Sequence, residues 1–254
     1  MSIRGYVRAW LPFEIRWRVK LASRLLADRR HATRFARRAT DATAFALQLS
    51  SYALELRCYP GQERQFEGKL HNVGLSLSAI DYMLLRPGDT FSFWRCVGRP
   101  TASRGYATAA ALRGGQLITE SGGSICLTST LLYNVGLLSG LTVVERHAHS
   151  VDTYGSDRYF ELGRDASVEF AYRDLRMRND LSAPVLLRCF VRGQDAHAES
   201  WADRNPDLSV ALTVCGSDSR PEPGTIAVQT IRTISERGSV RSERLGESRY
   251  IVPT

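Results

Sequence analysis

The chain has 254 residues, 43% of them hydrophobic and 24% charged, so it can bury a full core and has the composition of an ordinary globular protein. No stretch approaches the roughly 18 consecutive apolar residues of a membrane-spanning helix. Residues 1–8 also lack the apolar core of a secretory signal, so we expect a cytoplasmic protein.

The net charge of +8 is concentrated at the N-terminus. Residues 1–40 contain 11 Arg and Lys against 2 acidic residues, a net charge of +9, whereas the remaining residues carry 23 basic and 24 acidic groups, a net charge of −1. We therefore expect no nucleic-acid partner for the body of the protein. Residues 1–40 are expected to pack on the body as a solvated amphipathic helix. The alternative is peripheral contact with an anionic membrane, which Trp10, Phe13 and Trp17 among the basic residues make worth testing.

The first half of the chain is predicted to be largely helical, because its apolar residues recur at helical spacing. The expected elements are a helical region over 14–58, a break at 59–62, a helical or mixed segment over 70–85, a turn at 86–89, a strand over 90–94, a loop rich in Gly and Ala over 98–115, and a helix from about Cys126 to Gly140.

The second half changes to strand-like patterns. Strands are expected over 141–149, 166–172 and 184–191, a hairpin over 207–214 and 224–231, and, in a loosely held polar tail from Ser235, an edge strand over 248–252. The predicted fold class is α+β, with N-terminal helices, a central helix carrying Cys126 and a mostly antiparallel sheet. We expect a basic helical extension over 1–58, a central domain over 59–200, and a C-terminal hairpin and tail over 201–254 packed on that domain.

One of the five cysteines differs from the rest. The cysteines are odd in number and widely spaced, which is not the pattern of a disulfide framework. We expect Cys58, Cys96, Cys189 and Cys215 to be small buried core residues. Cys126 instead follows two glycines and Ser124, a predicted N-cap. It would then lie in the first turn of a helix, where unpaired N–H groups and the helix dipole favour a thiolate.

Two histidines and an aspartate complete a candidate catalytic set. On a strand, His147 and His149 would project from the same face, so either could reach Cys126, and Asp165 at the head of the next strand could orient the ring. The order Cys, His, Asp indicates nucleophilic acyl chemistry and is typical of papain-like and transglutaminase-like enzymes. Arg104 and Arg146 are candidates for binding a substrate carboxylate.

Two other interpretations of Cys126 stay open. It could be a buried thiol at a tight junction between loop and helix, or it could join His147 and His149 in a zinc site, with His71 as a fourth ligand. We expect no metal and no cofactor.

Six ordered blocks between Asn72 and Asn179 resemble the VanW family, named for an accessory protein of vancomycin-resistance clusters. The expected domain over 59–200 is thus similar to a VanW domain. The matching blocks are Arg86–Phe93 with Val97–Gly98, Arg104–Tyr106, Gly122–Cys126 continuing into Thr130–Asn134, Glu145–Ser150, Gly163–Ala166 and Asp174–Asn179.

The resemblance implies a cysteine acyltransferase. Some VanW domains act as L,D-transpeptidases that cross-link peptidoglycan through a cysteine thioester, and their nucleophile corresponds to Cys126. His149 or His147 would then carry the proton and Asp165 would hold the ring. Backbone N–H groups around Gly123, Ser124 and Ile125 would stabilise the oxyanion.

The expected substrate is a peptide, an amine or a cell-wall-related molecule. The alternative function is a non-catalytic module that binds a peptide or a wall fragment. The chain departs from the family at Ser124, where a third glycine is usual, and at Leu127, where a glutamine is usual.

Overall fold

The computed structural model describes residues 12–58, 63–113, 116–153, 155, 158–217, 222–236 and 238–252. The predicted break at 59–62 and Trp10 lie outside these residues. The helices described are α2 (Phe13–Arg30), α3 (Glu63–Ile80), α4 (Phe93–Val97), α5 (Cys126–Leu138) and the 3-10 helix η1 (Ala102–Arg104). No helix in the described ranges is both long enough and apolar enough to cross a bilayer.

An antiparallel sheet of five strands carries the main core. In spatial order its strands are β1 (Arg37–Arg38), β3 (Met83–Leu85), β9 (Val185–Arg192), β10 (Asp195–Ala202) and β2 (Leu47–Glu55). The strands β9 and β10 form a hairpin joined at Gly193, whose φ of 63° suits a tight turn. Alternate residues of β10 are buried, as expected for a strand with one face on the core.

The predicted helical region over 14–58 is helical only in its first part. The helix α2 ends at Arg30, and residues 47–55 form strand β2, which pairs along its length with β10. Leu47, Leu49 and Leu54 also fit a strand, because short apolar runs do not distinguish the two periods. The hydrogen bonds to β10 make this segment a strand. The predicted helical extension over 1–58 therefore contributes a strand to the central sheet.

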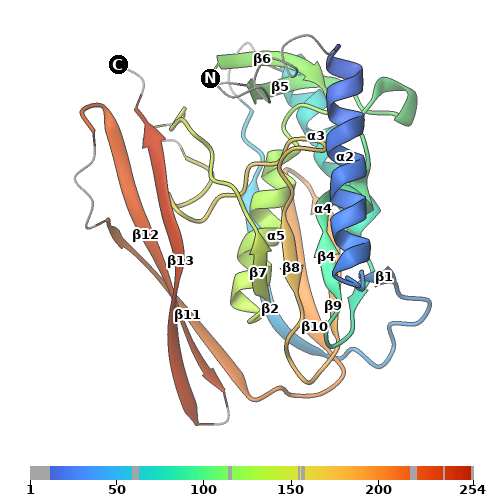
Figure 1. The fold of residues 1–254 in the computed structure, drawn as a ribbon, viewed down its shortest axis with the longest axis vertical. Helices are drawn as coiled ribbons and strands as arrows, with labels where there is room; N and C mark the ends of the chain where they lie inside the picture. Colours follow the sequence, from blue (N-terminus) through green and yellow to red (C-terminus); the bar gives the residue numbers. More distant parts are fainter. Residues whose placement is uncertain are drawn as a thin grey trace.

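The helix α5 lies at the centre of the molecule (Figure 1). It packs against β2 and β10 of the large sheet, and α3 packs against β9. Every residue from Leu127 to Leu137 is buried, so the helix is covered on all sides. The central helix that was expected to carry Cys126 is confirmed.

Smaller sheets flank this core. The sheet β4-β8-β7 comprises β4 (Thr90–Ser92), β8 (Arg176–Arg178) and β7 (Thr142–Glu145). The predicted strand over 90–94 stops early because Ser92 caps α4. The predicted Gly- and Ala-rich loop over 98–115 instead contains η1 and the strand β5 (Thr108–Arg113), which pairs with β6 (Gln116–Ser121) directly after it.

A long three-stranded sheet forms the C-terminal part (Figure 1). Its strands are β11 (Leu208–Gly216), β12 (Thr225–Glu236) and β13 (Ser239–Ile251). The predicted hairpin is confirmed, but the tail is not loosely held, because β13 pairs with β12 over nearly its whole length. The fold class is α+β with mostly antiparallel sheets, as predicted.

Candidate active site

Two glycines bring the chain from β6 into α5. A Cβ atom on Gly123 would lie 2.0 Å from the carbonyl oxygen of Ala109 in β5, so only glycine allows this close approach. Cys126 is the first residue of α5, as predicted. The Gly123 N–H donates to the Glu120 carbonyl oxygen at 3.1 Å and is already used. The N–H groups of Ile125 and Cys126 precede the first bond at the helix start, which Leu127 donates, so the predicted oxyanion role stays a prediction for them.

Ser124 does not cap the helix, contrary to the prediction. Its φ of 70° lies in the left-handed region, which favours glycine, and its Oγ donates to the Ala110 carbonyl oxygen at 3.0 Å. The cap position belongs to Ile125, which has no side-chain cap. The turn from β6 into α5 thus explains why a glycine suits this position.

This strain can be measured with two variants. We expect Ser124→Gly to be more stable than Ser124→Ala by about 1 kcal/mol, because both lose the Oγ hydrogen bond but only glycine adopts the left-handed conformation freely. Urea denaturation of the two variants gives the difference. Equal free energies of unfolding would show that the turn is not strained.

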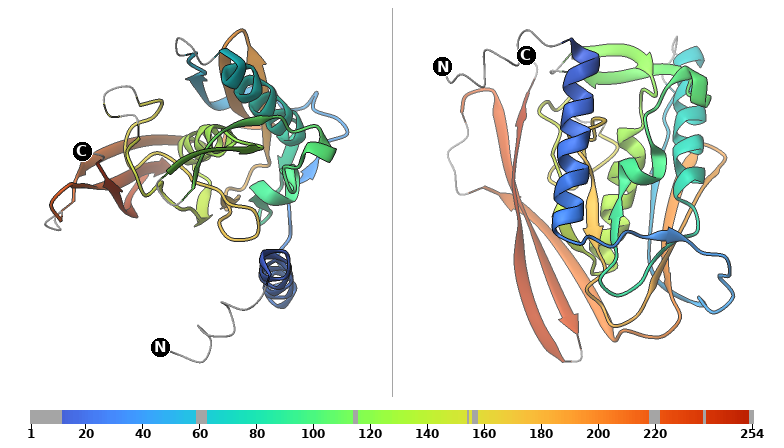
Figure 2. Two further views of the ribbon diagram at one scale, coloured as in Figure 1. Left: turned by 90° about the horizontal axis from the view of Figure 1, so that it is seen from above. Right: turned by 45° about the vertical axis from the view of Figure 1, so that its right-hand side comes forward.

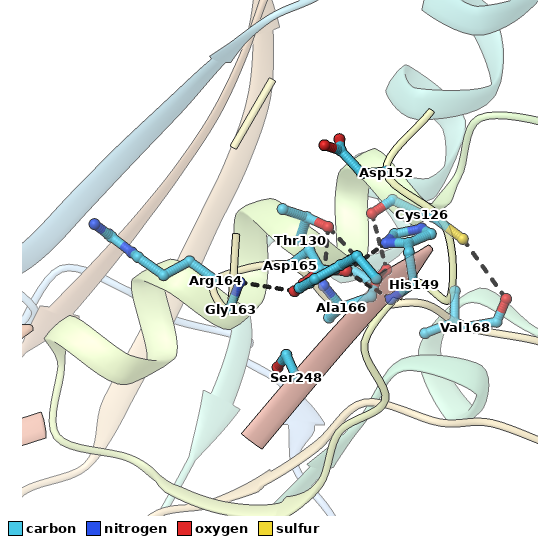
Figure 3. Close-up of polar contacts among 12 residues, drawn as sticks. Cys126, Thr130, His149, Asp152, Gly163, Arg164, Asp165, Ala166, Val168 and Ser248 are labelled. Carbon is cyan, nitrogen blue, oxygen red and sulfur yellow. Dashed lines mark hydrogen bonds and ion pairs between the residues drawn. The ribbon is translucent and has the colours of Figure 1, made fainter. Parts of the chain in front are cut away.

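The two histidines do not share a face, because β7 ends at Glu145 and residues 146–149 leave the strand. The ring of His149 meets Asp165, with 2.5 Å between Nδ1 and Oδ2, and the His149 backbone N–H donates to the same oxygen at 2.7 Å. His147 instead contacts Glu145, with 3.1 Å between Nε2 and Oε1. His149 is thus the histidine that is bonded to Asp165, and it lies near Cys126, whose Sγ donates to the Val168 carbonyl oxygen at 3.7 Å (Figure 3).

Asp165 lies in a buried loop, not at the head of a strand. The predicted strand over 166–172 is wrong, since these residues form only an isolated bridge between Glu169 and Arg173. The loop is held on α5 through Ala166, whose N–H donates to Thr130 Oγ1 and whose carbonyl oxygen accepts from Ser129 Oγ. These bonds from the second turn of α5 fix the loop beside the start of the same helix (Figure 3).

The Asp165 side chain is fully buried and accepts several hydrogen bonds. Arg146 Nη2 donates to Oδ1 at 2.8 Å, and the Tyr250 hydroxyl donates to the same oxygen at 2.6 Å. Burial by itself raises the pKa of Asp165, but the hydrogen bond and charge of His149, with the charge of Arg146, lower it to about 2. The carboxylate is therefore ionised over the whole neutral range.

The protonation of His149 follows from its neighbours. Burial lowers the pKa of this ring, but hydrogen bonds to Asp165 and to the Cys126 side chain outweigh burial and raise the pKa to about 10. The ring therefore holds its proton at neutral pH.

Tyr250 is a site residue that sequence reasoning missed. It lies on β13, is fully buried and, besides donating to Asp165, accepts the Gly163 N–H at 2.7 Å. Burial and the neighbouring Asp165 raise the pKa of Tyr250, so it stays a neutral donor. The segment was predicted as an edge strand, but no local pattern links Tyr250 to an aspartate 85 positions away.

The two candidate arginines make hydrogen bonds within the protein. Arg146 is bonded to Asp165 and donates from Nη1 to Ser248 Oγ at 2.7 Å, with only 8% of its side chain exposed. Arg104 Nη1 donates to the Val97 carbonyl oxygen at 2.7 Å. Neither residue lines the cleft described below. Their guanidinium groups position loops, and Arg146 positions the carboxylate of the candidate catalytic set.

The structure also shows where the other cysteines and the proposed fourth zinc ligand, His71, lie. Cys189 is buried, but Cys58 and Cys215 are exposed, so the prediction of core positions is wrong for these two. His71 Nε2 contacts the Gly105 carbonyl oxygen at 2.7 Å. Within the residues that the structure describes, no three His, Cys, Asp or Glu side chains are arranged to hold a metal ion. The zinc alternative of Cys126, His147 and His149 thus finds no ligand cluster in the described part of the chain.

The sulfur and the ring of this set line a cleft of about 500 Å³. This volume is typical of a small-molecule or peptide site. Aromatic side chains form part of its walls, and Phe160 stacks on His149 with 5.8 Å between ring centroids. The wall residues come from α2, α4, residues 99–102, β5, β6, α5, the loops around 149–173 and β13. Among them are Trp17, Trp94, Glu120, Asp152, Phe170 and Tyr250.

Comparison with known proteins agrees with the resemblance. The family model described as "VanW like protein" matches residues 68–201, which is more than half of the chain. The uncharacterized protein YoaR of Bacillus subtilis is 37% identical over 122 residues, which are 48% of this chain and 39% of that protein. The vancomycin B-type resistance protein VanW of Enterococcus faecalis is 31% identical over 141 residues, 55% of this chain and 51% of that protein.

The chain thus spans about half or less of the length of these curated relatives. No solved structure matches it. The family match covers Cys126, His149 and Asp165 together with the loop and helix that hold them. The chain therefore belongs to the VanW family.

Proposed function

We propose that this protein is a cysteine-dependent acyltransferase that acts on a peptide through a Cys126 thioester. One observation carries the proposal: the Cys126 thiol, at the first position of α5, and the His149 ring, which is bonded to a buried and ionised Asp165, line the same open cleft. A thiol at a helix start, an imidazole and an orienting carboxylate are the three parts that nucleophilic acyl chemistry needs. As in papain-like and transglutaminase-like enzymes, the cysteine opens a helix that packs beside the other two groups.

The proposed reaction has two steps. The Cys126 thiolate attacks a peptide carbonyl carbon, forming the C–S bond, and the N–H groups at the start of α5 bind the oxyanion. The C–N bond then breaks, and the leaving amine takes the proton from His149. In the second step an amine or water attacks the thioester, gives its proton to His149 and releases the thiolate.

A wall-type peptide is the proposed substrate class. The E. faecalis relative is named for vancomycin resistance, which supports a peptide linked to the cell wall rather than an unrelated amide. The cleft offers both apolar and charged wall residues, among them Trp17, Trp94 and Asp152, which suit a peptide that carries both kinds of group.

Trapping of an acyl-enzyme tests this function. The protein is incubated with a panel of wall stem peptides of different lengths, quenched in acid and weighed intact by mass spectrometry. We expect an adduct whose mass equals the peptide minus its leaving amine, located on Cys126 by peptide mapping and absent in Cys126→Ala. A Cys58→Ser/Cys215→Ser variant is the matched control, since it removes the exposed thiols and should keep the adduct. Unmodified Cys126 and intact peptide for every member of the panel would contradict the proposal.

A further inference from the structure

The helix α2 turns a polar face toward the body. Arg24 bonds both carboxylate oxygens of Glu145, at 2.8 and 2.6 Å, and donates to the Ala171 and Tyr172 carbonyl oxygens. Asp28 pairs with Arg176 at 2.6 Å. Trp17 packs edge-on against Phe170, with 5.6 Å between ring centroids. The helix therefore packs on the body, as predicted, but through ion pairs, hydrogen bonds and one aromatic contact.

The outward face of α2 is apolar. Ile15, Val19 and Leu26 are 44%, 59% and 54% exposed, and Ala22 between them is also exposed. At 100° per residue these four positions fall on one stripe, opposite the side occupied by Trp17, Arg24 and Asp28. A helix packed on a globular body normally shows the reverse arrangement, with its apolar stripe inward. The helix α2 itself lies at the periphery of the molecule, beside the body (Figure 2).

Basic residues border this stripe on both sides. Exposed Arg18 and Arg29 lie along one border, and exposed Arg30 lies along the other. The two acidic residues of the helix are engaged away from the stripe, Glu14 by Arg99 and Asp28 by Arg176. The outward face of α2 thus combines aliphatic side chains with a rim of positive charge.

This combination selects one kind of occupant. A second copy of the chain would bring two basic rims together, which repel each other. A nucleic-acid backbone would meet aliphatic side chains where its phosphates need donors. An anionic lipid surface satisfies both features, because acyl chains cover the stripe and headgroup phosphates pair with the rim.

We propose that the outward face of α2, made of Ile15, Val19, Ala22 and Leu26 with their basic rim, binds the surface of an anionic lipid bilayer. The helix then lies in the plane of the interface with its apolar stripe below the headgroups. Trp17, on the inward side of the same helix, lines the cleft of Cys126. Binding therefore holds one wall of the cleft close to the lipid surface.

Vesicle co-sedimentation tests this proposal. The full chain is mixed with vesicles of phosphatidylcholine and phosphatidylglycerol, and separately with vesicles of phosphatidylcholine alone. We expect binding to the anionic vesicles only, weakened by high salt. A Val19→Ser/Leu26→Ser variant should bind at least about tenfold more weakly, and Arg18→Glu/Arg29→Glu should lose the salt-sensitive part.

The control is Val240→Ser, which removes an equally exposed aliphatic side chain, 67% exposed, from β13. It should bind like the unchanged chain. Because all these positions are exposed, the variants are expected to fold, and circular dichroism checks this. Equal binding to both vesicle types, or equal loss in the control, overturns the proposal. Two other results also overturn the proposal. In the first, the unchanged chain is a dimer and Val19→Ser/Leu26→Ser makes it a monomer. In the second, the chain binds duplex DNA more tightly than anionic vesicles, and Val19→Ser/Leu26→Ser binds the DNA equally well.

Discussion

Replacing Asp165 by alanine is expected to lower the free energy of unfolding by about 3–5 kcal/mol. The carboxylate is fully buried and pairs with Arg146, whose side chain is only 8% exposed. Removal of the carboxylate leaves this guanidinium buried without its charge partner and leaves the Tyr250 hydroxyl without its acceptor. Urea denaturation followed by tryptophan fluorescence measures the loss.

Asp180→Asn is the matched control for this variant. Asp180 also pairs with an arginine, Arg178, but its side chain is 41% exposed, so its loss should change the free energy of unfolding by less than about 0.5 kcal/mol.

The difference in the free energy of unfolding between the unchanged protein and Asp165→Ala should also depend on pH. The folded pKa of about 2 lies below the ordinary value of 3.8, so the contribution is fully present above about pH 4 and is lost as the pH falls through 2. A pH-independent difference, or equal losses in both variants, would contradict a buried ion pair.

The helix α5 and Cys126 could be predicted because their signals are local. A glycine pair followed by an apolar pattern marks a helix start, and the structure begins the helix at Cys126. The C-terminal hairpin was predicted for the same reason, since each strand alternates by itself. Family membership also followed from short ordered blocks.

The position of His149 could not be predicted from the sequence. A strand over 141–149 would have put both histidines on one face, but β7 pairs with β8 only as far as Glu145. Asp165 then accepts the backbone N–H of His149 and contacts its ring. The loop that carries Asp165 is held by Thr130 of α5, about 36 positions earlier in the chain. Such long-range hydrogen bonds leave no periodic pattern in the sequence.

The order of strand β13 also could not be predicted from the sequence. Its polar residues suggested a loose tail, because the predicted burial of a strand usually requires alternating apolar residues. Three of its residues nevertheless matter to the site or its surroundings: Ser248 accepts from Arg146, Tyr250 donates to Asp165, and Ile251 bridges to Val151. A polar strand is held here by the hydrogen bonds of β12 and by the charge network that it completes.

Changing His149 to alanine is expected to slow acyl-enzyme formation by about 10²–10⁴-fold, the usual contribution of general acid–base catalysis. His147→Ala should change the rate by less than about twofold, because its ring contacts Glu145 and is 40% exposed. The two variants remove the same side chain two residues apart, so they separate the role of the ring from the effect of the substitution. The rate is measured by quenched-flow mass spectrometry with the peptide that gives an adduct.

The rate of alkylation by iodoacetamide tests the interaction of Cys126 with His149 without a substrate. An imidazolium-paired thiolate reacts at a rate that is nearly constant between about pH 6 and 8, whereas an ordinary thiol, with a pKa of about 8.5, reacts about tenfold faster per pH unit. Since a stabilised thiolate is also a weaker nucleophile, His149→Ala should lower the rate at pH 6 by about tenfold and restore the ordinary slope. Burial raises the pKa of Cys96 to about 12 and raises the pKa of Cys189 well above its ordinary value, so neither thiol should compete at neutral pH. A Cys126 rate with the ordinary slope in the unchanged protein would show that the ring does not stabilise the thiolate, and the acyltransferase mechanism would lose its nucleophile.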